Sequence, residues 1–320
     1  MPALKFGNTG PRVERLQRRL RATGYQLAID GTFSATTDAV VRAFQREHGL
    51  VADGVYGPRT EAALRLHAPL LLGVDVSSHQ DARSLDLRTL ARRDPIGLPR
   101  ARPEAEQGIR FIAIRATIGE GGEDLEWRDF LRRALDAGVP YVIFYHLLKA
   151  WQSVERQAER LAEALTEAAE IARGCGGVVA PAVDVEWPPE RDRQSQQIEL
   201  AGPATLAFLT RVSALTSQRG IVYTAPAFVR ASPLPWPPEL AAYPLWLAHF
   251  NGPGKPISAR LPLDLAPPDP WTRATFGQFD GDGGVMAPDG QDIDSNWYEG
   301  SREDFEREIV SPFCDEDTTP

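Results

Sequence analysis

Seven short apolar runs between residues 71 and 279 constrain the fold of this chain more than any other feature. Each run is rich in β-branched and aromatic residues, as strands buried on both faces are. Helical stretches at 125–138, 155–174 and 202–220 lie between several of them, and these stretches end on glycine, as helices often do. This alternation predicts the α/β class, as an irregular TIM-like β/α barrel. The predicted strands are 71–76, 111–117, 141–147, 177–186, 220–225, 244–250 and 275–279.

The N-terminal segment contains an internal repeat in place of this alternation. DGTFSATTDAV (30–40) is echoed by DGVYGPRTEAAL (53–64) at a spacing of 23 residues. Each copy begins with an Asp-Gly turn, and the threonine that follows, Thr37 or Thr60, is predicted to cap a helix. Apolar residues at helical spacing then predict a small three-helix unit without a catalytic cluster. We therefore expect one domain at 1–68 and a second at 69–320.

Charge divides at the same boundary. Residues 1–68 carry ten Lys and Arg against six Asp and Glu, so the remainder has a net charge of −13 within the overall −9. The basic unit could meet an anionic partner, or its arginines could simply form a solvated helix face. No base-reading motif accompanies them, so no nucleic acid partner is expected.

The sequence also limits where the chain is expected to act. No apolar run approaches the roughly 18 residues of a membrane helix, so we expect no membrane insertion. The start has no apolar core of a secretory signal. Cys175 and Cys314 are far apart and form no CxxC motif, so two free thiols are expected, with a disulfide between them as the alternative. A monomer is expected.

The stretch VVAPAVDVEWPP, residues 178–189, ends an apolar run with two carboxylates. Residues i and i+2 of a strand share a face, so Asp184 and Glu186 point the same way while Val185 faces the helical layer. The double proline then ends the strand. Neighbouring carboxyls cannot both ionise cheaply, so one should stay protonated near neutral pH, as glycosidic cleavage requires. The same pair could equally be a helix cap or an ion-pair partner.

Polar residues also occupy the ends of the other predicted strands. In a parallel barrel, function collects where strands end and the following loops begin. Asp75 alone could cap a turn, and Asp294 is expected in an aspartate-rich loop. A functional site is favoured because all of these residues are expected to lie together at one end of the barrel. The strand-end candidates are Asp75, Arg115, Thr117, Tyr145, His146, Asp184, Glu186, Tyr223, His249, Gln278 and Asp294.

Both parts of the chain resemble known families. The N-terminal repeat is similar, over nearly all of residues 5–66, to the peptidoglycan-binding domain at the ends of many cell-wall hydrolases, with Ser34 where that family usually has glycine. The remainder resembles glycoside hydrolase family 25, the Chalaropsis-type lysozymes. The matching stretches follow the family order: GVDVSSHQ (73–80), IRFIAIRATIGEG (109–121), AGVPYVIFYHLL (137–148), PAVDVEW (181–187), IVYTAPAF (221–228), PLWLAHF (244–250) and DIDSNWY (292–298).

This resemblance implies a muramidase that cuts the β-1,4 bond between N-acetylmuramic acid and N-acetylglucosamine. By position, it implies Glu186 as proton donor, Asp184 as its partner, and Asp75 and Asp294 as flanking acids. It implies Tyr145, Tyr223, Trp246 and Gln278 as substrate-binding positions, although the aromatic residues could equally be core. Whether a carboxylate or the N-acetyl group of the substrate is the nucleophile stays open.

One departure concerns the last predicted strand. The family usually reads Trp-Gln-Tyr where this chain has Gly277-Gln278-Phe279. A sugar-stacking platform is therefore expected to be missing, or to be replaced by Phe276.

Two other functions compete with this one. A non-catalytic peptidoglycan-binding protein on a degenerate barrel is the main alternative, and the altered stretch supports it. An amidase or peptidase is disfavoured because the five histidines lack zinc-binding spacing. The segment 280–292 superficially suggests calcium but has Gln291 where an EF-hand needs glutamate, so no metal or cofactor is expected. The expected partner is cell-wall peptidoglycan, reached by phage-type lysis or by a specialised secretion machine.

Overall fold

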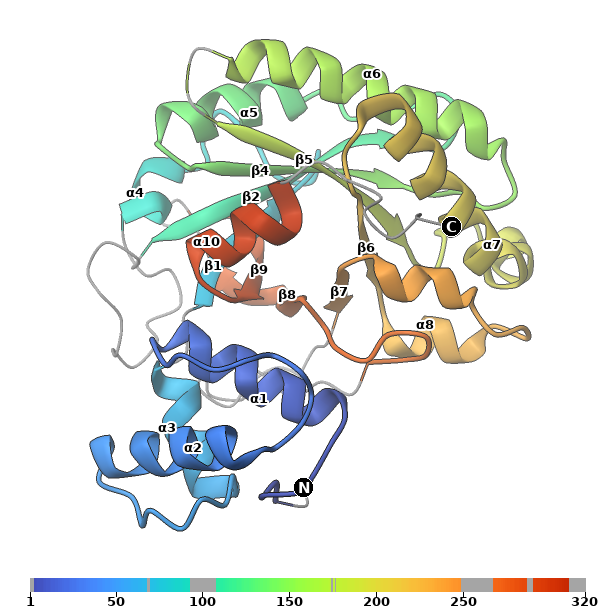
Figure 1. Cartoon of the computed structure of the whole chain (residues 1–320). Coiled ribbons are helices and arrows are strands. Elements are labelled where there is room, and N and C mark those ends of the chain that lie inside the picture. Colours follow the sequence, from blue (N-terminus) through green and yellow to red (C-terminus); the bar gives the residue numbers. More distant parts are fainter. Residues whose placement is uncertain are drawn as a thin grey trace.

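The computed structural model describes residues 3–67, 70–92, 108–173, 175, 177–248, 267–286 and 290–310. Its centre is a closed barrel of eight strands, in which β1 pairs with both β2 and β9, preceded by three helices (Figure 1). The two-residue strand β3 extends the edge of β2. The strands are β1 Leu70–Val76, β2 Ile109–Ile118, β3 Gly122–Glu123, β4 Tyr141–Leu147, β5 Val178–Val185, β6 Ile221–Thr224, β7 Leu245–Ala248, β8 Phe276–Met286 and β9 Asp292–Glu299.

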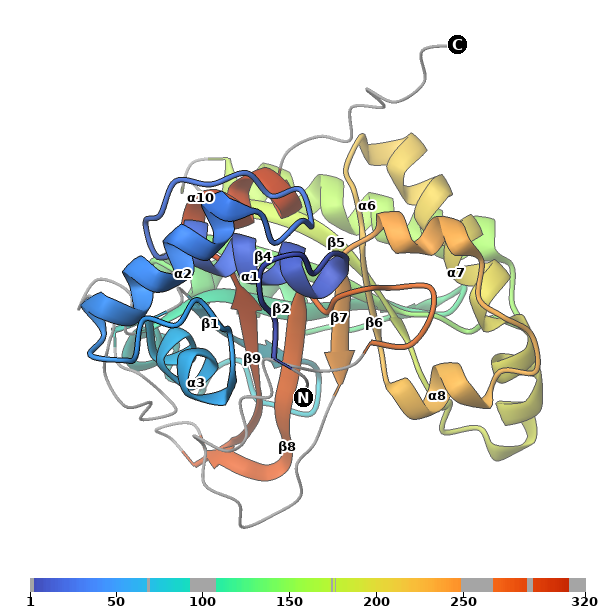
Figure 2. The same cartoon turned by 60° about the horizontal axis from the view of Figure 1, so that its bottom comes forward.

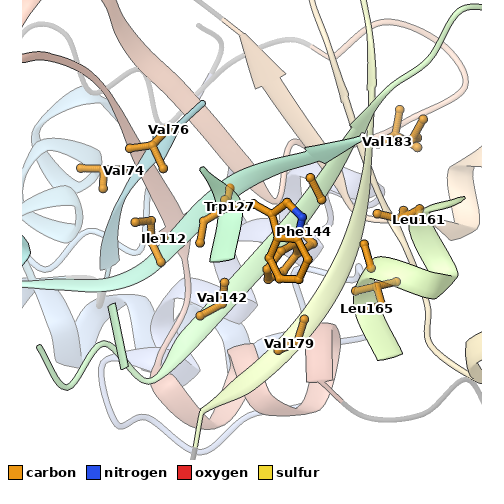
Figure 3. Close-up of a cluster of buried hydrophobic side chains, with 14 of the residues drawn as sticks. Val74, Val76, Ile112, Trp127, Val142, Phe144, Leu161, Leu165, Val179 and Val183 are labelled. Atoms are coloured by element: carbon orange, nitrogen blue, oxygen red, sulfur yellow. The ribbon is translucent and has the colours of Figure 1, made fainter. Parts of the chain in front are cut away.

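Helices cover the outside of the barrel, as the alternation predicted. Figure 3 shows the seam between strands and helices, where Phe144 of β4 meets Trp127 with ring centroids 5.2 Å apart. Leu161 and Leu165 of α6 belong to the same fully buried cluster. Each such side chain contributes about 1.5–3 kcal/mol through burial. The helices and helical turns of the barrel are α4 Leu87–Arg92, α5 Trp127–Asp136, α6 Val154–Ala172, η2 Arg191–Arg193, α7 Gln194–Thr216, α8 Pro226–Ala231, η3 Pro238–Ala242, α10 Arg302–Phe305 and η4 Glu306–Val310.

Aromatic packing fills the lower part of the barrel interior. Phe305 of α10 stacks on Tyr141 with ring centroids 4.5 Å apart and also packs against Phe111 and Phe276. A capping box between Ser301 and Asp304 fixes the start of α10. The foot of the barrel, where the parallel strands begin, is therefore filled by α10 and η4.

Strand β9 corrects one expectation. Asp294 was expected in a loop, but it lies on β9, which runs antiparallel between β1 and β8. Asp294 is the direct partner of Asp75 across this pairing. The aspartate- and glycine-rich composition of the region concealed the strand, because strand pairing uses backbone groups that every residue except proline supplies.

The N-terminal unit consists of α1 Pro11–Ala22, α2 Ala35–Glu47 and α3 Pro58–His67 around its own apolar cluster. The threonine caps were wrong: Ser34 is the N-cap of α2 and accepts from the Thr37 backbone N–H at 3.4 Å. The α3 helix likewise begins before Thr60. The threonine of each copy instead meets a buried glutamine of the preceding helix.

That glutamine explains the sequence repeat. The Gln17 side-chain amide donates to Asp30 Oδ1, the Thr32 carbonyl and Thr37 Oγ1 at 2.8–3.1 Å. Gln45 makes the equivalent three bonds in the second copy, at 2.8–3.0 Å, to Asp53 Oδ1, the Val55 carbonyl and Thr60 Oγ1. Each Asp-Gly turn is therefore tied to the helix before it.

Helix α1 packs the N-terminal unit against the foot of the barrel (Figure 2). Arg19, which is 3% exposed, forms an ion pair with Glu299 at the end of β9. Glu308 binds Arg18 at 3.4 Å and Arg273 at 2.8 Å. Glu299 pairs with Leu70, the first residue of β1, so the N-terminal unit lies at the opposite end of the strands from Asp75 and Asp294.

Within the described residues, one helical segment, Arg191–Thr216, is long and apolar enough to cross a membrane by length and composition. Its apolar residues Phe208 and Leu209 are buried in the barrel core. Gln197 ties it to the β4–α6 connection through the Leu148 carbonyl and the Ala150 N–H.

Cys175 is exposed and unpaired, as expected for one of the two thiols. The other, Cys314, lies outside the described residues.

Candidate active site

A cavity of about 530 Å³ opens at the carboxyl ends of the parallel strands, within the usual size range of ligand sites. All eight residues predicted for the site line it. They are Asp75, Tyr145, Asp184, Glu186, Tyr223, Trp246, Gln278 and Asp294. Sequence positions more than 200 residues apart are therefore brought to one place by barrel closure.

Asp184 and Glu186 lie at the end of β5, and Val185 between them packs into the core under the helices, as the strand alternation predicted. Asp184 is only 7% exposed, and its Oδ1 atom has no hydrogen-bond partner among the described residues. Glu186, beyond the last strand residue, is half-buried and reaches the cavity. The pair thus combines a deep carboxyl with a more accessible one.

Burial makes both carboxyls resist ionisation. The pKa of Asp184 is raised well above its usual value, first by burial and then by the neighbouring charges of Glu186 and Asp75. Burial and the charge of Asp75 also raise the pKa of Glu186. Arg115 opposes both shifts. Since two such groups titrate as a unit, the pair retains a proton at a pH where ordinary carboxyls have lost theirs.

Asp75 is held in a different way. Its Oδ2 atom accepts from Gln278 at 2.9 Å and from Asn296 at 2.7 Å. Burial raises the pKa of Asp75, and the two amide donors oppose that rise. The two amide donors fix the position of the Asp75 carboxyl on the cavity wall and favour its charged form against the effect of burial.

Gln278 connects the acids to the aromatic wall. Its amide donates to Asp294 Oδ2 at 3.1 Å as well as to Asp75, and its Oε1 atom accepts the Tyr223 hydroxyl at 2.7 Å. Gln278 therefore fixes three predicted site residues, so the middle position of the altered Trp-Gln-Tyr stretch keeps a structural role at the cavity.

The aromatic residues predicted to bind substrate differ in how they are placed. Trp246 is 2% exposed, and its indole N–H donates to Asn296 Oδ1 at 2.9 Å, so most of its ring is barrel core. Tyr145 is half-buried and donates its hydroxyl to the Val76 carbonyl at 3.4 Å. Burial and the charges of the nearby acids raise the pKa of both Tyr145 and Tyr223 well above the usual value, so both remain neutral donors.

The expectation that Phe276 replaces a sugar platform was wrong. Phe276 is completely buried, with its ring between Trp246 and Tyr298 in the barrel interior. A Cβ atom at Gly277 would lie 2.5 Å from the Trp297 ring, on the helix side of the strand. The room beside Gly277 is therefore filled by Trp297 of β9, and that position does not face the cavity.

Arg115 lines the cavity as well, although sequence analysis placed it only at a strand end and predicted no role for it. Its Nε lies 3.1 Å from Asp124 Oδ2, and its Nη2 donates to Ser78 Oγ at 2.9 Å. Asp124 also accepts from the Ser78 N–H at 2.8 Å. The signal that could have found it is its inward alternation with Ala113 on β2.

His146 and Thr117 are not part of the cavity. Thr117 Oγ1 lies 2.7 Å from His146 Nδ1, and His146 Nε2 lies 3.0 Å from Gln157 Oε1 of α6. Burial lowers the pKa of His146 to about 4, so it stays neutral. This is a buried structural contact between strand and helix. His249 lies outside the described residues.

No group of three or more His, Cys, Asp or Glu side chains in the described part of the chain could hold a metal ion. Within the segment 280–292, residues up to Met286 extend β8, and Asp292 begins β9. The ends of this segment are therefore paired strands and not a continuous ion-binding loop.

A closed β/α barrel with a pair of buried acids in a cavity at the carboxyl ends of its strands is an arrangement typical of hydrolases. Residues 74–285 match the family described as glycosyl hydrolases family 25, and residues 9–64 match a putative peptidoglycan binding domain. The chain belongs to glycosyl hydrolase family 25, whose members are glycoside hydrolases of the lysozyme type. Asp294 and Asn296 lie beyond the matched residues.

Solved structures and curated relatives agree with each part. The chain is similar to a family 25 lysozyme from Aspergillus fumigatus, with a TM-score of 0.51 and 17% identity, covering 76% of this chain and 100% of that one. It is 44% identical over 64 residues to an N-acetylmuramoyl-L-alanine amidase of Bacillus licheniformis. It is 48% identical over 60 residues to a zinc D-Ala-D-Ala carboxypeptidase of Streptomyces albus G. These matches span 19% and 18% of this chain but only 18% and 24% of those relatives.

The two family matches together indicate the bacterial cell wall as the place of action and peptidoglycan as the polymer partner.

Proposed function

We propose that this chain is a muramidase that hydrolyses the β-1,4 bond between N-acetylmuramic acid and N-acetylglucosamine in peptidoglycan. Glu186 is the general acid and Asp184 its partner. The observation that carries the proposal is the buried pair itself. Two carboxyls lie at the end of one strand, the pKa of both is raised, and one oxygen of Asp184 has no hydrogen-bond partner among the residues that the structure describes.

The different depths of the two carboxyls support this division of roles. Glu186 is the more accessible carboxyl and donates the shared proton to the glycosidic oxygen. Asp184, deeper in the wall, becomes the carboxylate that stabilises the positive charge developing at the sugar carbon. Asp75 and Asp294, fixed through Gln278, supply the flanking negative charge.

Residues 1–68 act as a wall-binding domain and residues 69–320 as the catalytic domain. Binding to the insoluble polymer raises the local concentration of glycan at the barrel. Release by phage-type lysis is the route that we favour over delivery by a secretion machine. A neighbouring holin gene would support this route, whereas a neighbouring gene for a periplasmic immunity protein would support the other.

Digestion of purified peptidoglycan tests the reaction. The wild type should release reducing ends, and mass spectrometry of the muropeptides should show muramic acid at the new ends. Glu186→Gln should lower the rate about 10²–10⁴-fold, the range for general acid–base catalysis. Wall binding by the wild type without new reducing ends would instead favour the non-catalytic alternative.

A further inference from the structure

Ser77, His79 and Gln80 are polar residues at one side of the cavity. Along the wall that carries the aromatic residues, the side-chain donors are already engaged within the protein. The Tyr145 hydroxyl donates to the Val76 carbonyl, and the Tyr223 hydroxyl donates to Gln278. The Trp246 indole N–H donates to Asn296, and the Gln278 amide donates to Asp75 and Asp294. At the rim, the Gln291 amide donates to the Asp81 carbonyl and to Ser84. Substrate oxygens therefore have little choice of donor along this wall.

Arg115 differs from these residues. Its guanidinium is 13% exposed and is fixed on one side by Asp124 and Ser78. Its Nη1 group makes no hydrogen bond to any part of the chain that the structure describes. It is also the only Lys or Arg among the described residues that line the cavity, beside four carboxyls.

The Arg115 guanidinium is already held in place by Asp124 and Ser78. An acceptor that reaches Nη1 therefore binds without the usual entropy cost of ordering an arginine side chain.

The substrate has one group that suits this donor. Muramic acid differs from N-acetylglucosamine by a lactyl ether, whose end is a carboxylate in bare glycan or an amide carbonyl where the peptide is attached. Both forms present acceptor oxygens, and the carboxylate would be repelled by the acids of the cavity. A positioned guanidinium offsets that repulsion and satisfies the acceptor.

We propose that Arg115 is the specificity residue that recognises the lactyl group of muramic acid. The inference rests on the proposed function, since it names the part of that substrate that Arg115 reads. It predicts that Arg115 distinguishes peptidoglycan glycan from a chitin-type chain with the same β-1,4 linkage.

Binding in the Glu186→Gln background tests this without turnover. Calorimetry would compare an N-acetylglucosamine–N-acetylmuramic acid tetrasaccharide with chitotetraose. Arg115→Met should weaken binding of the muramic saccharide about 10- to 100-fold, as for a charge-assisted hydrogen bond. Chitotetraose affinity should change less than about twofold. The loss should be larger for the free lactyl carboxylate than for its amide.

Arg110→Met is the matched control, since Arg110 lies on the same strand but does not line the cavity. It should change neither affinity, and Arg115→Lys should recover only part of the discrimination. An equal loss for both saccharides would overturn the proposal and leave Arg115 a positioning residue. If neither saccharide bound the parent protein, the proposed function would fail as well. Cleavage of peptidoglycan by the wild type without this discrimination would sink the Arg115 proposal alone.

Discussion

The two parts of the molecule treat buried polar groups in opposite ways. In the N-terminal unit, Gln17 and Gln45 are each 1% exposed, and each amide donates three hydrogen bonds. In the barrel, Asp184 is also buried, but its Oδ1 atom has no hydrogen-bond partner in the described part of the chain. Satisfied polar groups hold a structure together, whereas an unsatisfied acid beside a second acid is unfavourable for stability and available for chemistry.

The largest expected effect is on Asp184. Asp184→Asn should lower kcat about 10²–10³-fold, because the partner charge is lost from the transition state. At pH 7 the same change should raise the free energy of unfolding, because it removes a buried carboxyl whose charged form is disfavoured by burial and by its acidic neighbours. Reducing-end assays and urea titration would measure both.

The exposed residue Asp192 supplies the control, because Asp192→Asn should change neither quantity. A less stable Asp184→Asn variant with unchanged kcat would show that Asp184 is a structural acid.

The junction between the two parts comes next. Arg19→Met leaves the largely buried Glu299 without its ion-pair partner and should lower the free energy of unfolding by about 3 kcal/mol. Calorimetry should show the helical unit melting separately from the barrel. The double variant Arg19→Met/Glu299→Leu should recover most of the loss. If Arg19→Met instead melted in one transition at the wild-type temperature, the packing described for α1 would be contradicted.

The repeated glutamines give a smaller effect. Gln17→Leu and Gln45→Leu should each lower the stability of the helical unit by about 2 kcal/mol, because an aspartate, a carbonyl and a threonine lose their donor. Binding to insoluble walls should weaken, while kcat/KM on a soluble glycan stays unchanged. Gln26→Leu, at an exposed position of the same unit, is the matched control. If Gln17→Leu or Gln45→Leu also lost activity on the soluble glycan, the two parts of the molecule would not be independent in the way described.

The smallest effect concerns stability against pH. The folded-state pKa of Asp184 is raised, so the native protein holds more protons than the unfolded chain above about pH 4. Stability from this group is complete below that pH and declines as pH rises through the folded pKa, by at most about 1.4 kcal/mol per unit. The contribution of Asp184 is isolated by measuring, at each pH, the difference in unfolding free energy between the wild type and Asp184→Asn. A difference that is constant from pH 4 to 8 would contradict the raised pKa.

The sequence predicted most of the barrel because strands buried on both faces leave an apolar signature. It predicted the shared face of Asp184 and Glu186 because strand periodicity is strictly two. It missed β9 because Asp294 stands in an aspartate-rich region where pairing depends on backbone groups. It misplaced the helix caps because Thr37 is held by Gln17, a contact between two helices that local pattern cannot show.

Arg115 was found at a strand end but could not be given a role from sequence. Its importance depends on which donors around it are already engaged, and that requires the positions of Gln278, Trp246 and two tyrosines at once.

Carbon-13 NMR of aspartate- and glutamate-labelled protein tests the central claim most directly, since it follows the protonation of each carboxyl with pH. Assignments would come from the resonances lost in Asp184→Asn and Glu186→Gln. We predict that the pair keeps one proton well past the pH range near 4 where ordinary carboxyls lose theirs, because burial raises the pKa of both groups. If both resonances titrate together near pH 4, the acid pair holds no proton at neutral pH, and this account of its chemistry is wrong.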